Sequence, residues 1–398
     1  SGTDCPGMLP TALTATTVGP LADNGCTTPL ADGTCVMTHA LLPGSEALDV
    51  SVNGTATDQR GYSADGVRDV GAFELQTLAL CPPALQTDGF STSVATTAEL
   101  IEAMECANAN GEANGGDTIN LSADITLTAE YENDAIWGST GTPPVNTAMT
   151  LDGQGYALER DGALNCDINF NNGSEEFRLL RVSNTGHLAL NHAVLRGGCA
   201  DSNGMTDPDG GGVANEGTLS ISNSVIDNNQ SSGYGGGLTA RGGVIEFIEN
   251  TTFSNNYAQL RGGGLNQTLG AITSVTNTIF SNNNATDGGG MYVEDMTVSL
   301  MNNVTFSGNT ANMGSAMVNQ FATISNLQNS LFHDGSSCGY ISGFGSTFTG
   351  SNNMADGTSG SNCPGVLATT LTASTVGPLA DNGCTTPLAD GTCVLTHA

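Results

Sequence analysis

Three aspartates in one short segment are the residues whose chemistry is easiest to name. Asp201, Asp207 and Asp209 lie within residues 199–210. Carboxylate oxygens are preferred calcium ligands, so this segment is a candidate calcium site. The spacing matches no EF-hand loop, which makes the pattern a weak signal. Calcium is the one cofactor that the sequence suggests, and we expect no other.

Side chains able to act as an acid, a base or a nucleophile are few and scattered. All eight basic residues are arginine, and none is lysine. Arg196, Arg241 and Arg261 could line one face of a regular fold, yet no adjacent pair of carboxylates accompanies them. His187 and His192 are better explained as structural residues. Because no nucleophile motif, P-loop or dinucleotide fingerprint occurs either, we expect a protein without enzymatic activity.

The chain contains 11 cysteines, an odd number that leaves one without a partner inside the chain. No CxxC pair and no cluster of Cys with His occurs, so a zinc site is not expected. Local disulfides are expected instead, and they indicate an oxidising, extracellular setting. The expected pairs are Cys26–Cys35, Cys384–Cys393, Cys338–Cys363, Cys166–Cys199 and Cys81–Cys106, with Cys5 unpaired or bonded to another module.

The charge balance excludes some classes of partner. The formal net charge is -31. It rules out nucleic-acid binding through phosphate neutralisation and disfavours binding to anionic membranes. No run of 18 apolar residues occurs, so no membrane span is expected. Ser1 follows no signal peptide, and we expect a mature or internal sequence.

A short sequence repeat dominates the middle of the chain. The tripeptide Gly-Gly-Gly recurs there at almost constant intervals, at residues 210–212, 235–237, 262–264 and 288–290. A fixed period of roughly 20 to 50 residues is typical of a solenoid, in which each repeat packs only on its neighbours.

Short alternating runs between the glycines indicate which solenoid this is. The runs are residues 218–222, 244–248, 272–275 and 296–300. Their period of two and their β-branched residues are typical of strands. Three short strands and three bends per repeat predict an all-β fold, a parallel β-helix with coils about 4.8 Å apart.

Two further sets of residues keep the phase of the repeat. An apolar residue precedes an asparagine by three positions in each repeat. The apolar set is Ile226, Phe253, Phe280 and Phe306, and the asparagines are Asn229, Asn256, Asn283 and Asn309. We expect the first set to stack inside the coils. We expect the second to form a hydrogen-bonded ladder, although they could instead be simple turn residues.

The segments before the predicted β-helix are of two kinds. Residues 79–93 are predicted to be a linker, and residues 96–110 an amphipathic helix whose capping box pairs Thr96 with Glu99. Such a helix would close the open edge of the first coil. We expect the β-helix to occupy residues 94–335.

The two ends of the chain repeat each other. Residues 1–40 and 359–398 are identical at 33 of 40 aligned positions, at an offset of 358. We therefore expect tandem modules: a cap module at 1–78 that ends a preceding repeat, and the start of the next at 336–398. Cys5 is then the copy of Cys363, and its partner would belong to the preceding module.

Four motifs in residues 1–76 resemble the choice-of-anchor Q domain of bacterial surface proteins. In order, they are Gly-Pro-Leu-Ala-Asp-Asn-Gly, Thr-His-Ala-Leu-Leu-Pro-Gly-Ser, Asp-Gln-Arg-Gly and Asp-Val-Gly-Ala-Phe-Glu. The resemblance implies a small module that closes a right-handed β-helix and carries no chemistry. Arg60 and Arg68 with their neighbouring acids are then interpreted as ion pairs that hold this cap.

Residues 94–335 resemble the pectate-lyase-like β-helices of polymorphic outer-membrane and related surface proteins, through the Gly-Gly-Gly and Phe-Ser-Asn-Asn repeats. The resemblance implies a right-handed parallel β-helix at a cell surface. β-helices of this kind include polysaccharide lyases and hydrolases. Those enzymes use Lys or Arg bases with calcium-binding acids, or Asp pairs, which this chain does not reproduce.

Three functions follow from these patterns. The first is a structural module of an extracellular fibre that assembles with itself, as tandem modules or as a head-to-tail homopolymer. The second is an adhesin that binds a glycan or another cell-surface ligand. The third is a polysaccharide lyase or hydrolase. Only residues 129–148, with Tyr131 and Trp137, and residues 199–210 are long insertions of the kind an adhesin needs, which favours the fibre.

Overall fold

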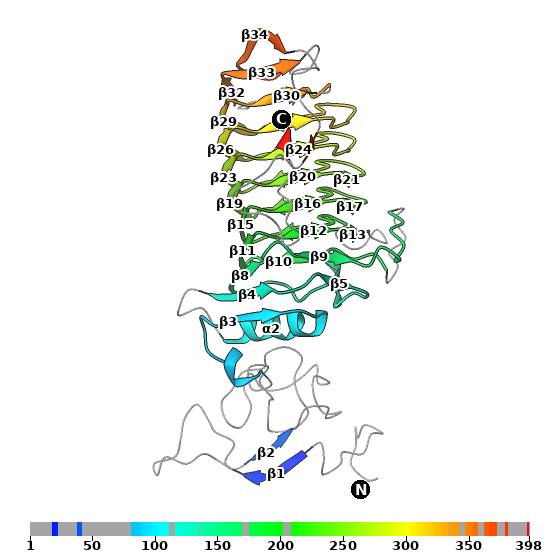
Figure 1. Ribbon diagram of the computed structural model, residues 1–398, viewed down its shortest axis with the longest axis vertical. Coiled ribbons are helices and arrows are strands. Elements are labelled where there is room, and N and C mark those ends of the chain that lie inside the picture. Colours follow the sequence, from blue (N-terminus) through cyan, green and yellow to red (C-terminus); the bar gives the residue numbers. More distant parts are fainter. Residues whose placement is uncertain are drawn as a thin grey trace. The chain divides into compact units, whose positions relative to one another are not determined.

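The protein is described here by a computed structural model that divides the chain into two units, residues 1–87 and 88–398. The second unit is a parallel β-solenoid of about nine turns (Figure 1). The described residues are 18–22, 38–41, 81–110, 116–134, 136–168, 175–201, 208–333, 335–341, 347–356, 362–371, 379–380 and 396–397. The rest of the predicted cap module at 1–78, with Arg60 and Arg68, lies outside them.

Three parallel sheets run along the solenoid. Sheet I consists of β3 (Ser91–Val94), β4 (Asp117–Leu121), β8 (Ala148–Asp152), β11 (His187–Asn191), β15 (Thr218–Ser222), β19 (Val244–Glu249), β23 (Ala271–Thr276), β26 (Thr297–Asn302), β29 (Thr323–Gln328) and β32 (Thr347–Ser351). Sheet II consists of β5 (Ile125–Leu127), β9 (Ala157–Arg160), β12 (Val194–Arg196), β16 (Val225–Asp227), β20 (Thr252–Ser254), β24 (Ile279–Ser281), β27 (Thr305–Ser307), β30 (Leu331–His333), β33 (Asn353–Asp356) and β34 (Val366–Leu371). Sheet III consists of β10 (Leu180–Val182), β14 (Val213–Asn215), β18 (Leu238–Arg241), β22 (Leu265–Thr268), β25 (Met291–Glu294), β28 (Met317–Gln320) and β31 (Cys338–Ile341).

One coil visits the sheets in a fixed order. From sheet I the chain passes to sheet II, then to a short third side and through the glycine turn to sheet III. The short side is the small sheet of β13 (Cys199–Ala200), β17 (Gln230–Ser231) and β21 (Tyr257–Ala258). The predicted strands are confirmed: residues 218–222 form β15, and runs 244–248 and 272–275 lie in β19 and β23. The fourth run overlaps β26, which begins one residue later, at Thr297.

Glycine is needed in the triplets for two reasons: the backbone conformation of the first residue, and the close approach of the next coil to the other two. Gly262 has a φ of +65°, a conformation that costs little only for residues without a Cβ. A Cβ added to Gly263 would lie 2.5 Å from the carbonyl oxygen of Asn284, and one on Gly264 would lie 2.6 Å from that of Gly290. The first glycine of the triplet therefore makes the turn, and the next two let the following coil approach.

The interior apolar row is present as predicted, and it extends one coil further. Phe253 stacks on Phe280 with ring centroids 4.9 Å apart, and Phe280 on Phe306 at 5.2 Å. Phe306 stacks in turn on Phe332 at 5.5 Å. Ile226 is paired with Phe253 in the same register and is fully buried. These offset ring stacks add to the free energy already gained by burying the rings.

The asparagine ladder is also present. The amide group of Asn256 donates to Oδ1 of Asn283 at 2.9 Å, and that of Asn283 donates to Oδ1 of Asn309 at 3.0 Å. Asn229 donates to Asn256 in the same way, at 3.1 Å. Each of these side chains is buried, and each also accepts a backbone N–H or donates to a carbonyl of a neighbouring coil.

A second row of asparagines lies on the outside and was not predicted. Its members share a left-handed backbone conformation at the bend between sheets I and II. They are Asn223, Asn250, Asn277, Asn303 and Asn329. Along this row, Asn250 donates to Asn223 and Asn277 donates to Asn250, both at 3.2 Å. Asparagine tolerates this conformation better than other residues with a side chain, so the repeat places it here.

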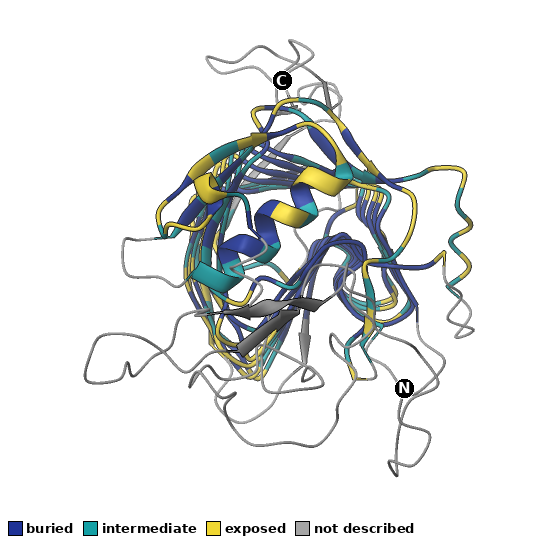
Figure 2. Ribbon diagram, turned by 90° about the horizontal axis from the view of Figure 1, so that it is seen from below, coloured by how far each residue is buried: buried dark blue, intermediate teal, exposed yellow. Residues whose placement is uncertain are grey.

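Helix α2 (Thr97–Asn110) covers the first coil, as expected for the N-terminal cap (Figure 2). Its capping box is formed: the amide of Glu99 donates to Oγ1 of Thr96, and the amide of Thr96 donates to the Glu99 carboxylate. Leu100, Met104 and Ala107 are buried as predicted, whereas Ile101 is only half-buried. The helix thereby shields the strand edge that would otherwise be open.

The solenoid is longer at both ends than predicted. The linker 79–93 contains the 3-10 helix η1 (Pro83–Leu85) and also β3, which pairs with β4. At the other end, β31 to β34 continue the three sheets beyond residue 335. Met291 pairs with Met317, and Met317 pairs with Cys338, so the later coil contains fewer residues than the one before it. The predicted boundary at 335 is wrong because the last coils are shorter and break the period.

Substitution of Asn283 by alanine is expected to destabilise the solenoid by about 3 kcal/mol, because the buried partners of its side chain are left without a hydrogen bond. Chemical denaturation of the two proteins measures the difference. Asn326→Ala is the control, since Asn326 is exposed on β29, and it should cost less than about 0.5 kcal/mol. Equal midpoints for both variants would contradict a ladder that stabilises the fold.

The carboxyl of Asp117 makes stability depend on pH. Its Oδ1 accepts the amide of Phe90 at 2.9 Å, and burial raises its pKa although hydrogen bonds oppose the shift. A raised folded-state pKa favours the folded protein at low pH, and this contribution is lost as the pH rises through that pKa. Relative to Asp117→Asn, the natural protein should therefore lose stability as the pH rises above the usual pKa of an aspartate, about 4. Urea denaturation at several pH values tests this, and a difference that stays constant with pH would refute it.

Candidate functional site

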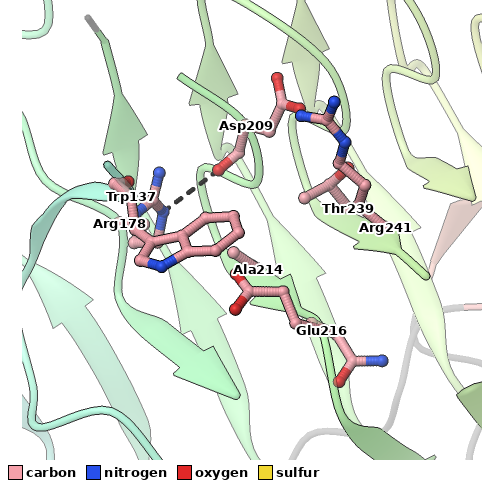
Figure 3. Close-up of a pocket in the computed structure, with 8 residues that line it drawn as sticks. Trp137, Arg178, Asp209, Ala214, Glu216, Thr239 and Arg241 are labelled. Carbon is pink, nitrogen blue, oxygen red and sulfur yellow. Dashed lines mark hydrogen bonds between the residues drawn. The ribbon is translucent and has the colours of Figure 1, made fainter. Parts of the chain in front are cut away.

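One described residue from each of the two long insertions noted in the sequence lines a recess on sheet III. Trp137 comes from the first insertion, in the turn between β6 (Glu132–Asp134) and β7 (Gly138–Thr140), and Asp209 comes from the second. The enclosed part of the recess is no larger than about one water molecule. Figure 3 shows Trp137 and Arg178 on one side and Thr239 and Arg241, from β18, on the other.

One buried arginine fixes both insertions to the coil. Arg178 lies just before β10 and is 2% exposed. Its guanidinium donates to the carbonyl oxygen of Trp137 and, at 3.1 Å, to that of Asp209. Because the guanidinium is planar and its donors are fixed in direction, the two carbonyls are held in one relative orientation.

The ring of Trp137 is held by its own turn and by a second arginine. Oδ1 of Asp134 accepts the amides of Ile136 and Trp137 at 2.7 and 2.8 Å. Burial opposes ionisation of Asp134, but these two hydrogen bonds, with Arg181 and Arg178 nearby, lower its pKa. Arg181 lies 4.8 Å from the centroid of the Trp137 ring.

Arg181 is itself anchored by an acid of the next coil. Its guanidinium forms an ion pair with Glu216 at 3.1 Å, and both side chains are largely buried. Glu132, on the same hairpin as Trp137, has a raised pKa because it is buried, although Arg181 lowers it in part. Acidic and basic side chains therefore lie next to one another around the recess, and their charges largely cancel.

A second arginine cluster on sheet III is closed. Arg261 lies 4.7 Å from the ring centroid of Tyr292 and 5.6 Å from that of Tyr234. It pairs with Glu294 at 2.7 Å, and the Tyr292 hydroxyl bonds to Gln320. Tyr292 is completely buried, and that burial raises the pKa of its hydroxyl. This cluster joins neighbouring coils.

The candidate calcium ligands are only partly described. Asp201 and Asp209 are buried, and Oδ1 of Asp209 accepts the amide of Tyr234 at 2.7 Å. Asp207 lies outside the described residues. Among the residues that the structure describes, no group of three or more side chains is arranged to hold a metal ion. The calcium site therefore stays a prediction. In the structure, the Asp209 carboxylate is used instead to accept the backbone amide of Tyr234.

The other candidate residues are dispersed. Arg196, on sheet II, pairs with Glu159 at 3.0 Å, whereas Arg241 ends β18 of sheet III. The possibility that Arg196, Arg241 and Arg261 line one face is not realised, because Arg196 ends β12 of sheet II and the bend between the sheets separates it from the other two. His187 lies 3.5 Å from Glu246 on the outer face of sheet I, and His192 has a φ of +51° at a bend.

Two of the predicted disulfides are described. Cys166 is bonded to Cys199 and Cys338 to Cys363, with Cα separations of 5.8 and 5.0 Å. Cys81 and Cys106 are each disulfide-bonded. The remaining predicted cysteines, Cys5, Cys26, Cys35, Cys384 and Cys393, lie outside the described residues. The Cys166–Cys199 bridge ties down the start of the second insertion.

Comparison of the chain with protein-family models, with curated proteins and with solved structures finds no match. Within the described residues, no helix is both long enough and apolar enough to cross a membrane. What the protein does therefore has to be inferred from its coils, its repeated ends and the recess.

Replacing Arg178 by alanine is expected to release the Trp137 turn and to cost about 2–4 kcal/mol, because two buried carbonyl groups lose their donor. Trp137 is the single tryptophan of the chain, so its fluorescence reports on this turn directly. We expect a red-shifted emission in the folded variant and faster amide exchange at residues 136–140. Arg196→Ala removes a half-exposed arginine and is the control. Unchanged emission after Arg178→Ala would show that Arg178 does not position the ring.

Proposed function

We propose that this chain is a structural module of an extracellular fibre, built from β-solenoids joined end to end through the repeated segment at its two ends. The observation that carries the proposal is that the second copy of this segment takes part in the solenoid. Residues 366–371 of this second copy form β34, the last strand of sheet II, which pairs with β33. In the first copy the equivalent residues are 8–13.

A disulfide supports the same arrangement. Cys363 belongs to the second copy and is bonded to Cys338 in β31. The equivalent of Cys363 in the first copy is Cys5, at the offset of 358. The proposal assigns Cys5 an equivalent bond to the preceding module, so that each junction has one strand and one covalent bridge.

The two copies also fold alike where both are described. β1 (Val18–Ala22) pairs antiparallel with β2 (Thr38–Leu41), and Leu21 lies opposite His39. β35 (Leu379–Ala380) pairs antiparallel with β36 (Thr396–His397), and Leu379 lies opposite His397. Leu379 and His397 follow Leu21 and His39 by the same 358 residues, so the two hairpins have the same register. This is the behaviour of a repeated structural unit, and it supports the interpretation of residues 1–78 as a cap module like the choice-of-anchor Q domain.

The remaining features suit an external structural role. Intramolecular disulfides persist in oxidising compartments, and a large net negative charge keeps an exposed polymer soluble. A solenoid gains stability from each added coil, so it can form a stiff rod without a large globular core. The proposal includes the absence of catalysis, which is supported by the lack of lysine and by the ion pairs that occupy Arg181, Arg196 and Arg261.

Electron microscopy of the native material, together with denaturing electrophoresis, tests the proposal. Filaments with a regular axial repeat and a denatured mass far above the 40.3 kDa of this chain would support tandem modules. Filaments that dissolve into single chains of this mass would support head-to-tail assembly of separate chains. Isolated short rods would overturn the fibre.

Paired cysteine variants provide the control. Replacing Cys338 and Cys363 by serine removes the bridge at the proposed junction, and filaments should become shorter or break at regular intervals. Replacing Cys166 and Cys199 removes the same number of bonds inside the solenoid and should leave filament length unchanged. Equal effects of the two pairs would argue against a junction at residues 338–371.

A further inference from the structure

We propose that the outer face of sheet I, from β19 to β32, is a contact surface for a second copy of this chain, which packs against it flank to flank. We call this surface the lateral face. Its strands follow one another along one side of the solenoid (Figure 1). The inference goes beyond the end-to-end junction of the proposed fibre and does not depend on it, because the junction uses the edge of the last strands and the lateral face uses outward side chains.

The first argument is where the exposed apolar side chains gather. Within the described part of the chain seven large hydrophobic side chains are exposed, and four of them belong to the lateral face or its border. Val244 and Phe247, on β19, are 37% and 38% exposed. Leu269 and Phe321 are 50% and 40% exposed, and each lies two residues before a strand of sheet I. Exposed apolar side chains gathered on one face are typical of a contact surface.

The second argument is the backbone conformation of Leu269 and Phe321. Their φ angles are +62° and +55°, and the equivalent positions of neighbouring coils hold Gly242 and Asp295. A left-handed conformation is costly for a bulky side chain. Neither side chain gains much from the fold in return, since both are about half exposed. Two such residues at equivalent positions of the repeat therefore indicate a contact outside this chain.

The third argument is charge. The four strands of the lateral face after β19 contain no charged residue, and their outward side chains are mostly Thr and Ser. Acidic side chains lie at its border, Glu246 and Glu249 on β19 and Asp295 at the bend before β26. With a formal charge of -31, two copies repel each other wherever acids face acids. An uncharged surface lets them approach closely without that cost.

The fourth argument is periodicity, and it identifies the partner as a second copy. Equivalent outward side chains follow one another coil by coil, and one such row is Ala271, Thr297, Thr323 and Thr347. Their spacing is that of paired strands, about 4.8 Å. An identical face has the same spacing at every coil, so rows of short side chains from the two copies pack between one another. A partner with a different spacing loses this match after a few coils.

The size of the lateral face sets the expected strength of the contact. Its five strands contain five or six residues each. At the usual strand spacing and rise they cover roughly 450 Å² on each copy. Each partner of a stable complex usually contributes about 800 Å², so two single chains form a weak dimer. Modules joined in a row would add such contacts along their length.

Sedimentation equilibrium of the whole chain tests the proposal. We expect a reversible dimer with a dissociation constant on the order of 0.1–1 mM. Dimerisation should strengthen when salt is raised from about 0.05 M to 0.5 M, because salt screens the repulsion between two acidic chains. A contact held by ion pairs would weaken instead. A chain that stays monomeric at about 1 mM, or a dimer that salt dissociates, would overturn the lateral face. Neither result bears on the end-to-end fibre, which electron microscopy tests separately.

Asparagine variants locate the contact. Leu269→Asn and Phe321→Asn together remove two apolar side chains and place at each positive φ a residue that tolerates it better. This double variant should dimerise at least about tenfold more weakly, with an unchanged or higher melting temperature. Leu260→Asn is the matched control, because Leu260 is 41% exposed but lies after β21, away from sheet I; its effect should stay within about twofold.

Two outcomes of these variants would refute the lateral face. Equal dimerisation by the double variant and the natural chain would show that the copies meet elsewhere, for example at their ends. A lowered melting temperature of the double variant would show that Leu269 and Phe321 serve the fold and not a contact between copies.

Discussion

The parallel stacking of coils is the constraint on which the rest of the structure depends. In each of the three sheets, every inner strand pairs with the strand of the coil before it and of the coil after it. Equivalent residues therefore lie about 4.8 Å apart in straight rows. A residue type that packs well with itself is repeated, as Phe253, Phe280, Phe306 and Phe332 show. A polar residue is tolerated inside only if its copy satisfies it, which is the role of Asn256 and Asn283.

Because strands pair only with those of neighbouring coils, the first and last strands of the solenoid each have an edge without a partner strand. An open last strand offers unpaired backbone groups to any other strand. At one end helix α2 covers the first coil, and at the other β34 adds a strand from the repeated terminal segment. A module whose closing strand belongs to the next repeat is suited to continue into another module. The proposed fibre is thus a consequence of how the open end is closed.

Departures from the repeat concentrate on one flank. The recess is lined by Trp137 and Asp209, one from each insertion, and Arg178 donates to the backbone carbonyl of both. The Arg261 cluster, only a few coils away, uses similar residues, and its Tyr292 is completely buried.

The sequence by itself determined the fold class, the interior phenylalanine row and the asparagine ladder, because a nearly constant repeat length fixes which side chains stack. It also identified two disulfides and the capping box of α2, which depend on local spacing. It did not determine the end of the solenoid, since the coils after Phe332 shorten and lose the marks of the repeat. Nor did it identify the recess, the role of Arg178 or the separation of Arg196 from Arg241. Those features depend on which residues of different coils and insertions meet in space, and only the tertiary structure decides that.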